Sequence, residues 1–164
     1  MRVISLILGI MMMTTLVQAK SASSDDLIAK HPFHAVQLIF AGVSAFDHEL
    51  MNAMATDDFQ LLEVGEVWDM DDFTAVVKRS SMVRRNYFSI IKSDINENFA
   101  WVNYWNKATY IDSKVADAPL REVAWLESAI MVKTAKGWKV QQLHSTRIKV
   151  ENLPKNIELV EFKL

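Results

Sequence analysis

The sequence predicts an α+β domain in which helices near the N-terminus pack on one face of an antiparallel sheet. Early in the chain, apolar residues recur every three or four positions, as on a helix with one buried face. Later segments are rich in aromatic and β-branched residues, which favour strands. The chain has 164 residues, of which 51% are hydrophobic, and a chain of this size can bury a substantial core as one domain.

The first predicted helix covers His34 to Met54. Its buried stripe consists of Val36, Ile39, Val43, Phe46, Leu50 and Met54. A short strand from Phe59 to Val64 should follow, with a turn at Gly65. Asp69 then suits the N-cap of a second helix, because its side chain can accept hydrogen bonds from the first free backbone N–H groups. This helix should include Phe73, Val76 and Val77 and extend toward Tyr87.

Extended structure is expected from Phe88 onward. The predicted strands are Ser89–Ile95, Phe99–Asp112, Glu122–Lys133 and Trp138–Val150. The tail, residues 151–164, either adds an edge strand or forms a loosely docked extension. We therefore expect a linker at 20–32, a domain at 33–150 and a C-terminal extension at 151–164.

Residues 1–19 have the features of a secretory signal peptide. Arg2 supplies the positive charge, an apolar stretch runs from Val3 to Val17, and Ala19 is a small residue before a cut. The stretch is short for a membrane-spanning helix, which needs ~20 apolar residues, although an uncleaved anchor is the alternative. We expect cleavage before Lys20, contact with the membrane only during export, and a periplasmic or secreted bacterial protein. The absence of cysteine agrees with this, because small eukaryotic secreted domains usually contain disulfides.

Composition argues against several classes of function. The chain has 18 Lys and Arg against 20 Asp and Glu, so it lacks the basic balance typical of nucleic-acid binding. Its four histidines have no metal-ligand spacing and there is no cysteine, so no metal site is expected. The sequence has no glycine-rich phosphate loop and no serine nucleophile motif, and it predicts no cofactor.

From about Phe33 to Arg147 the sequence resembles the SnoaL-like branch of the nuclear transport factor 2-like (NTF2-like) superfamily. The segments that carry the resemblance are Phe46–Phe59, Phe99–Val102, Trp125–Lys133 and Lys136–Thr146. The resemblance implies a cone, in which a bent antiparallel sheet and N-terminal helices enclose a pocket, and a homodimer formed across the outer sheet face. Its members include isomerases, hydrolases, cyclases and binding modules, so the resemblance leaves the activity open.

Six residues are expected to lie near the pocket: Trp68, Trp101, Asn103, Trp105, Glu127 and Ser145. Trp101, Asn103 and Trp105 lie on the predicted strand Phe99–Asp112 and share one face, because alternate residues of a strand point to the same side. The resemblance to kinase association domains indicates that the Ser145 face, rather than the His144 face, is turned to the pocket. Glu127 alternates with apolar residues, so its carboxylate should either pair with Arg147 or Lys139 or have a raised pKa.

The leading hypothesis is an exported protein that binds a small, partly apolar molecule in the cone. The second is a cofactor-independent isomerase, lyase or hydrolase with a carboxylate base. Candidate bases and hydrogen-bond donors for it are Glu127, Asp69, Asp71, Tyr104 and Tyr87, with Glu127 the best base. The third is a dimeric assembly module without chemistry. His144 is expected to be a structural residue.

Overall fold

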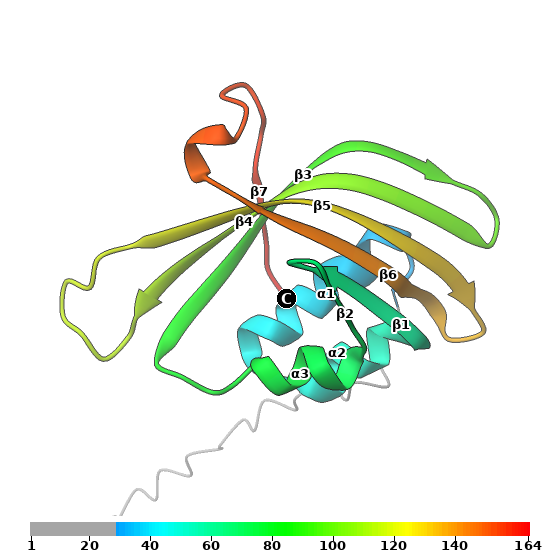
Figure 1. The fold of residues 1–164 in the computed structure, drawn as a ribbon, viewed down its shortest axis with the longest axis horizontal. Coiled ribbons are helices and arrows are strands. Elements are labelled where there is room, and N and C mark those ends of the chain that lie inside the picture. Colours follow the sequence, from blue (N-terminus) through cyan, green and yellow to red (C-terminus); the bar gives the residue numbers. More distant parts are fainter. Residues whose placement is uncertain (1–28) are drawn as a thin grey trace, which may run out of the picture.

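Three α-helices and one seven-stranded sheet make up residues 29–164, the part of the chain that the computed structural model describes (Figure 1). The elements are α1 (Pro32–Ala45), α2 (His48–Met54), β1 (Ala55–Glu63), β2 (Glu66–Trp68), α3 (Met70–Val76), β3 (Met82–Ile95), β4 (Phe99–Asp112), β5 (Arg121–Thr134), β6 (Gly137–Ile148), the 3₁₀ turn η2 (Val150–Asn152) and β7 (Val160–Phe162). The predicted signal peptide and most of the predicted linker lie outside the described residues. No helix of the described part is long and apolar enough to cross a membrane.

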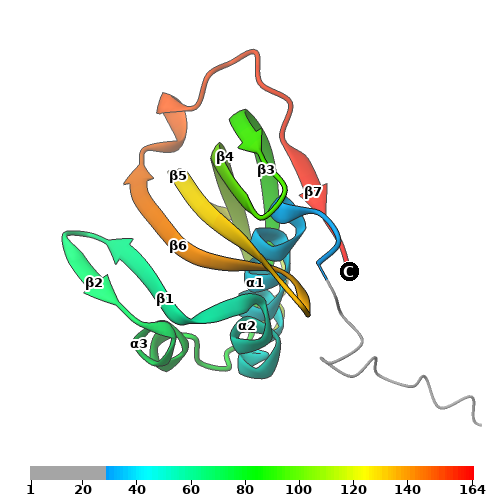
Figure 2. The same ribbon diagram turned by 90° about the vertical axis from the view of Figure 1, so that its right-hand side faces the viewer.

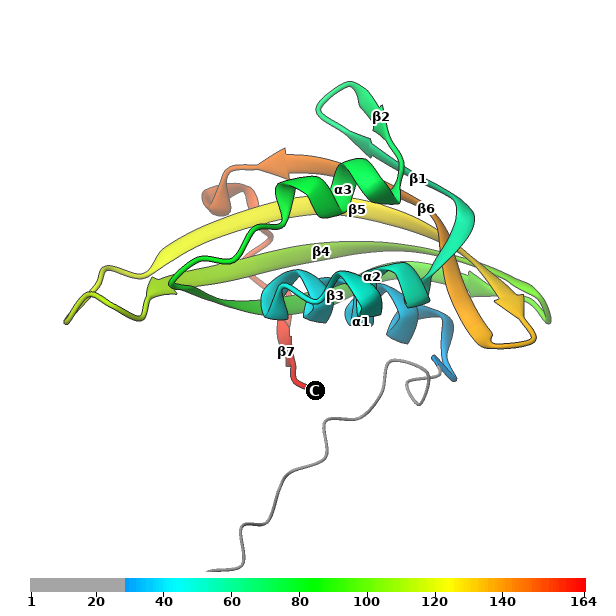
Figure 3. The ribbon, with the colours of Figure 1, turned by 90° about the horizontal axis from the view of Figure 1, so that it is seen from below.

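The sheet has the strand order β2-β1-β6-β5-β4-β3-β7. All neighbours pair antiparallel except β1 and β6, which run parallel. Strands β3 to β6 are long and bend together, and the three helices lie on one side of them (Figures 2 and 3). The fold is therefore the predicted α+β cone, with an inner face turned to the helices and an outer face turned away from them.

The core lies between α1, α2 and the inner face of the sheet. Helix α1 packs against β3, β5 and β6. Phe33 of α1 meets Phe88 of β3 and Tyr104 of β4 edge to face, with ring centroids 5.7 and 5.1 Å apart. Buried aromatic pairs of this geometry stabilise the fold by more than the area that they bury. They therefore fix α1 against the middle of the sheet.

The predicted helix at 34–54 is two helices in the structure. Phe46 has a left-handed backbone (φ 57°), and the Asp47 side chain caps α2 by accepting a hydrogen bond from Leu50 N at 3.0 Å. A local cap of this kind competes with continuation of the helix. The helix therefore breaks at Phe46, although the apolar spacing of the sequence continues across the break. Gly42 permits the turn, because a Cβ there would lie 2.6 Å from Cγ of Met51.

Helix α3 begins as predicted, with Asp69 and Asp72 capping each other's backbone N–H groups. It ends at Val76, however, and β3 already begins at Met82, so the prediction of helix toward Tyr87 is wrong. Long antiparallel pairing with β4 decides the conformation there and overrides the local helical pattern.

The two ends of the sheet also differ from the predictions. Strand β1 begins at Ala55, four residues before the predicted start, because it pairs with β6 from Ala55 to Glu63 across an irregularity. In the tail, β7 pairs with β3 and forms the opposite edge of the sheet. Of the two alternatives for residues 151–164, the edge strand is therefore confirmed.

Candidate functional site

A cavity of about 250 Å³ opens on the inner face of the sheet, next to α3 and the β1–β2 hairpin. Its walls are mainly apolar and aromatic, formed by Phe40, Leu61, Val64, Trp68, Phe73, Trp125 and Leu143. Its polar lining consists of Glu63, Arg84, Glu127 and Ser145. Apolar walls with a few convergent polar groups are typical of small-molecule sites.

Three polar side chains form a row across the inner face, and two of them, Glu127 and Ser145, line this cavity. Tyr104 of β4, Glu127 of β5 and Ser145 of β6 are register neighbours, and they are only 0%, 4% and 6% exposed. Ser145 Oγ donates to Glu127 Oε1 at 3.2 Å, and Asn106 Nδ2 donates to Glu127 Oε2 at 3.0 Å. The carboxyl group of Glu127 therefore has a hydrogen bond on each oxygen.

Burial raises the pKa of Glu127 from 4.5 to about 7. Hydrogen bonds from Asn106 and Ser145, the nearby Tyr104 hydroxyl and the positive charge of Arg84 lower it, but by less than burial raises it. The expected pairing partners do not reach it: Lys139 Nζ donates to the Ala55 carbonyl and Arg147 is exposed. Of the two sequence-based alternatives, pairing is wrong and the raised pKa is confirmed.

Two buried polar atoms beside Glu127 have no hydrogen-bond partner of good geometry, Tyr104 Oη and Asn106 Oδ1. Burial, followed by the charge of Glu127, raises the pKa of Tyr104 well above its ordinary value. The phenol therefore stays neutral near pH 7, and its hydroxyl can donate to the carboxylate or accept the proton of the carboxylic acid. The group is thus equipped to hold Glu127 in either protonation state.

The structure brings together three of the six predicted pocket residues. Trp68, Glu127 and Ser145 line the cavity. Trp101, Asn103 and Trp105 do not, because successive residues of a strand point to opposite faces and Tyr104 points inward, toward Phe33 of α1. Their register partners are Ile130, Ser128 and Leu126 on the outer face. The prediction that this aromatic face lines the pocket is therefore wrong.

The other sequence candidates also lie away from the cavity. Asp69 and Asp71 are exposed residues at the start of α3. Tyr87 is on the outer face, where Lys107 Nζ lies 5.4 Å from its ring centroid. His144 is exposed, as the inward orientation of Ser145 requires. In the described part of the chain, no group of three or more metal-ligating side chains could hold an ion.

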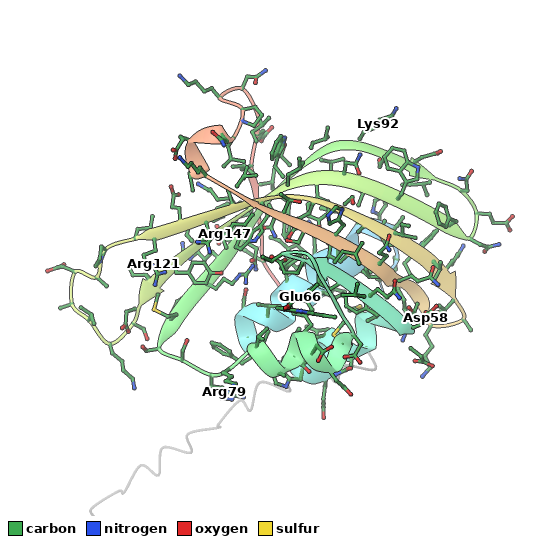
Figure 4. The ribbon with its side chains drawn as sticks, viewed as in Figure 1. Asp58, Glu66, Arg79, Lys92, Arg121 and Arg147 are labelled. Carbon is green, nitrogen blue, oxygen red and sulfur yellow. The ribbon has the colours of Figure 1, made fainter. Side chains whose placement is uncertain are left out.

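Sequence reasoning missed Arg84, Asn106 and Trp125. Arg84 was hidden because its segment was assigned to the end of a helix, although it is a strand whose even-numbered residues face inward. Asn106 and Tyr104 alternate on one face, which could have identified the inner side of β4. The charged side chains labelled in Figure 4, such as Asp58 and Lys92, are exposed, whereas Glu127 is buried.

Comparison with known proteins gives similarity in structure alone. No protein-family profile and no curated protein sequence matches the chain. A ketosteroid isomerase-like protein from Erwinia carotovora covers 72% of this chain and 94% of its own, with a TM-score of 0.55 and 17% identity. The CaMKII hub homology domain of Chlamydomonas reinhardtii covers 71% and 95%, with a TM-score of 0.59 and 16% identity. An NTF-2-like protein from Silicibacter pomeroyi covers 71% of this chain and 92% of its own, with a TM-score of 0.50 and 9% identity. These similarities show the fold.

Replacing Glu127 by Gln should change how stability depends on pH. Between pH 4.5 and about 7 the native state retains a proton that the unfolded state releases. The wild type should therefore lose about 3 kcal/mol of unfolding free energy across that range through this group. Urea unfolding at pH 5 and pH 8 measures the loss, which E127Q should largely remove. E97Q, at an exposed loop position, is the control, and parallel pH profiles for E127Q and the wild type would contradict the assignment.

Proposed function

We propose that this chain, which has the cone fold of the NTF2-like superfamily, binds a small, partly apolar molecule in the cavity at Glu127. The observation that carries the proposal is the combination of aromatic walls and a polar base in one concave site. Trp125, Phe73 and Trp68 supply apolar contact area. Glu127 and Ser145 can fix the orientation of one polar group of the ligand.

Export is the second part of the proposal. It rests on the apolar segment and small residues of 1–19, with cleavage before Lys20. The bound molecule would then be one available in a bacterial periplasm or in the medium.

Filling the cavity should weaken binding without removing the fold. Leu143 lines the cavity and is 2% exposed, so L143F places extra atoms in the space that a ligand needs. Cyclohexanone and benzyl alcohol are probes of suitable size, and saturation-transfer NMR measures their binding. We expect L143F to weaken binding by about tenfold or more, which corresponds to ~1.4 kcal/mol.

The matched control is L126F, because Leu126 is on the outer face and 39% exposed. This variant should bind the probes like the wild type. Thermal melting shows whether both variants are folded. Equal binding by a folded L143F and the wild type would place the ligand elsewhere and overturn the proposal.

A proton-transfer enzyme is the second candidate, and the raised pKa of Glu127 favours it. A carboxyl group that titrates at about pH 7 is well matched to general base catalysis near neutrality. Here the carboxylate would remove a proton from a carbon next to a carbonyl group, which leaves an enolate. The carboxylic acid would then protonate the enolate at the same or another carbon, either with the same proton or with one exchanged from solvent. Tyr104, at the register position next to Glu127, can hold the base through its hydroxyl.

Deuterium exchange tests this candidate directly. The wild type in D₂O should replace the α-hydrogens of cyclohexanone faster than buffer does, at a rate that rises with pH through about 7 as Glu127 becomes ionised. E127Q should lower the rate by about 10² to 10⁴, whereas E97Q should leave it unchanged. Exchange by E127Q at the wild-type rate would exclude Glu127 as the base.

Self-association is the third candidate, alone or together with binding. Some structures similar to this chain are described as association or hub domains of CaMKII. The outer face also carries the partly exposed side chains of Trp101, Trp105 and Leu126, which a second copy of the chain could bury.

Sedimentation velocity measures the state of association. We expect a homodimer for the wild type and a monomer for L126E, because a charge in the centre of an apolar contact is costly to bury. L120E is the control, since Leu120 is 60% exposed just before β5 and outside the paired strands. A monomeric wild type would rule out this candidate.

A further inference from the structure

Arg84 enters the same cavity from β3, and three aromatic rings surround its guanidinium group. The guanidinium carbon lies 5.5 Å from the ring centroids of Phe40 and Tyr110 and 5.6 Å from that of Trp125. Arginine stacks favourably on aromatic faces. The side chain is half-buried and lines the cavity together with Glu127. The ring contacts therefore hold the charge in place without themselves using its N–H donors.

Asn86 positions the Arg84 side chain through a hydrogen bond. Arg84 Nε donates to Asn86 Oδ1 at 2.8 Å. Asn86 is 3% exposed, and its Nδ2 donates to the Phe40 carbonyl at 3.1 Å and to Ser44 Oγ at 2.7 Å. Both acceptors belong to α1, so the direction of the guanidinium is tied to the helix that forms one side of the cone.

Within residues 29–164, no carboxylate oxygen lies within 4.0 Å of the Arg84 guanidinium; the ion pairs there involve Arg85 and three lysines. Glu63, the other carboxylate of the cavity lining, is not paired with it either. Burial lowers the pKa of Arg84, and its interactions with Tyr110 and then with Glu127 raise it by less. A partly desolvated guanidinium has five N–H donors, and a planar anion could satisfy the terminal ones in a bidentate manner.

We propose that the ligand is a small organic monocarboxylate, with its carboxylate on the terminal nitrogens of Arg84 and its apolar body against Trp125 and Phe73. This inference rests on the proposed binding function and adds the chemical class of the ligand. One negative charge fits because Arg84 is the one cationic side chain among the described residues that line the cavity. The neutral form of Glu127 is then the donor that meets a second polar atom of the ligand, where one is present. The aromatic walls favour a ligand whose remaining part carries no further charge.

Paired acids and amides test the charge requirement. Benzoate and hexanoate carry the carboxylate, and benzamide and hexanamide are neutral molecules of nearly the same shape. Isothermal titration calorimetry at pH 6.5 should give about tenfold or more tighter binding for each acid than for its amide, because a hydrogen bond to a charged group is stronger than a neutral one. R84Q should remove this preference, and R84K should keep part of it, since lysine retains the charge but not the planar fork.

R85Q is the matched control. Arg85 adjoins Arg84 but is exposed, with 63% of its side chain accessible, so the same loss of charge should leave the preference for acids unchanged. Thermal melting confirms folding, and R84K serves if R84Q is unstable.

Equal binding of acids and amides by the wild type, or an unchanged preference in R84Q or R84K, would overturn the assignment to Arg84. If the amides nevertheless bind and L143F removes that binding, the proposed binding function stands without the anion. If none of the four probes binds the wild type, both proposals fail for molecules of this size.

Discussion

The burial of one carboxyl group shapes the inner face of this protein. Glu127 is 4% exposed and accepts hydrogen bonds from Asn106 and Ser145, yet it lies in no ion pair with a described residue. Hydrogen bonds from neutral donors compensate only part of the cost of taking a carboxylate out of water. The group therefore keeps its proton to about pH 7. A core that only had to be stable could place an apolar residue there at lower cost, which is why we propose that this position has a functional role.

Strand alternation in a bent sheet separates the inner face from the outer one. Tyr104, Glu127 and Ser145 form one row across β4, β5 and β6 on the inner face. Trp105 and Leu126 form the neighbouring register pair, whose side chains point to the outer face. The inner row can meet a small molecule and the outer row can meet another protein surface. The proposed binding and the proposed self-association would thus use different side chains of the same strands, and substitutions can separate them.

The sequence was sufficient for the fold class and for three pocket residues, and the errors have physical causes. Strong β-branched and aromatic patterning located β4 at its observed limits, Phe99 to Asp112. The break at Phe46 was not visible because the apolar spacing continues into α2. The inner face of β4 was misjudged because period-2 alternation identifies two faces but not which one faces the helices. Arg84 was missed for a third reason: long-range pairing, not local propensity, makes its segment a strand.

The most direct measurement of the central claim is the titration of Glu127 itself. The side-chain carboxyl ¹³C chemical shift of Glu127, assigned by comparison with E127Q, reports its protonation as the pH is changed. The structure predicts a midpoint of about 7, caused by burial of the carboxyl group at the base of the cavity. A midpoint near the ordinary value of ~4.3 would contradict it. That result would mean that water or an unrecognised cation reaches the carboxylate, and that its position alone gives no reason to assign it a function.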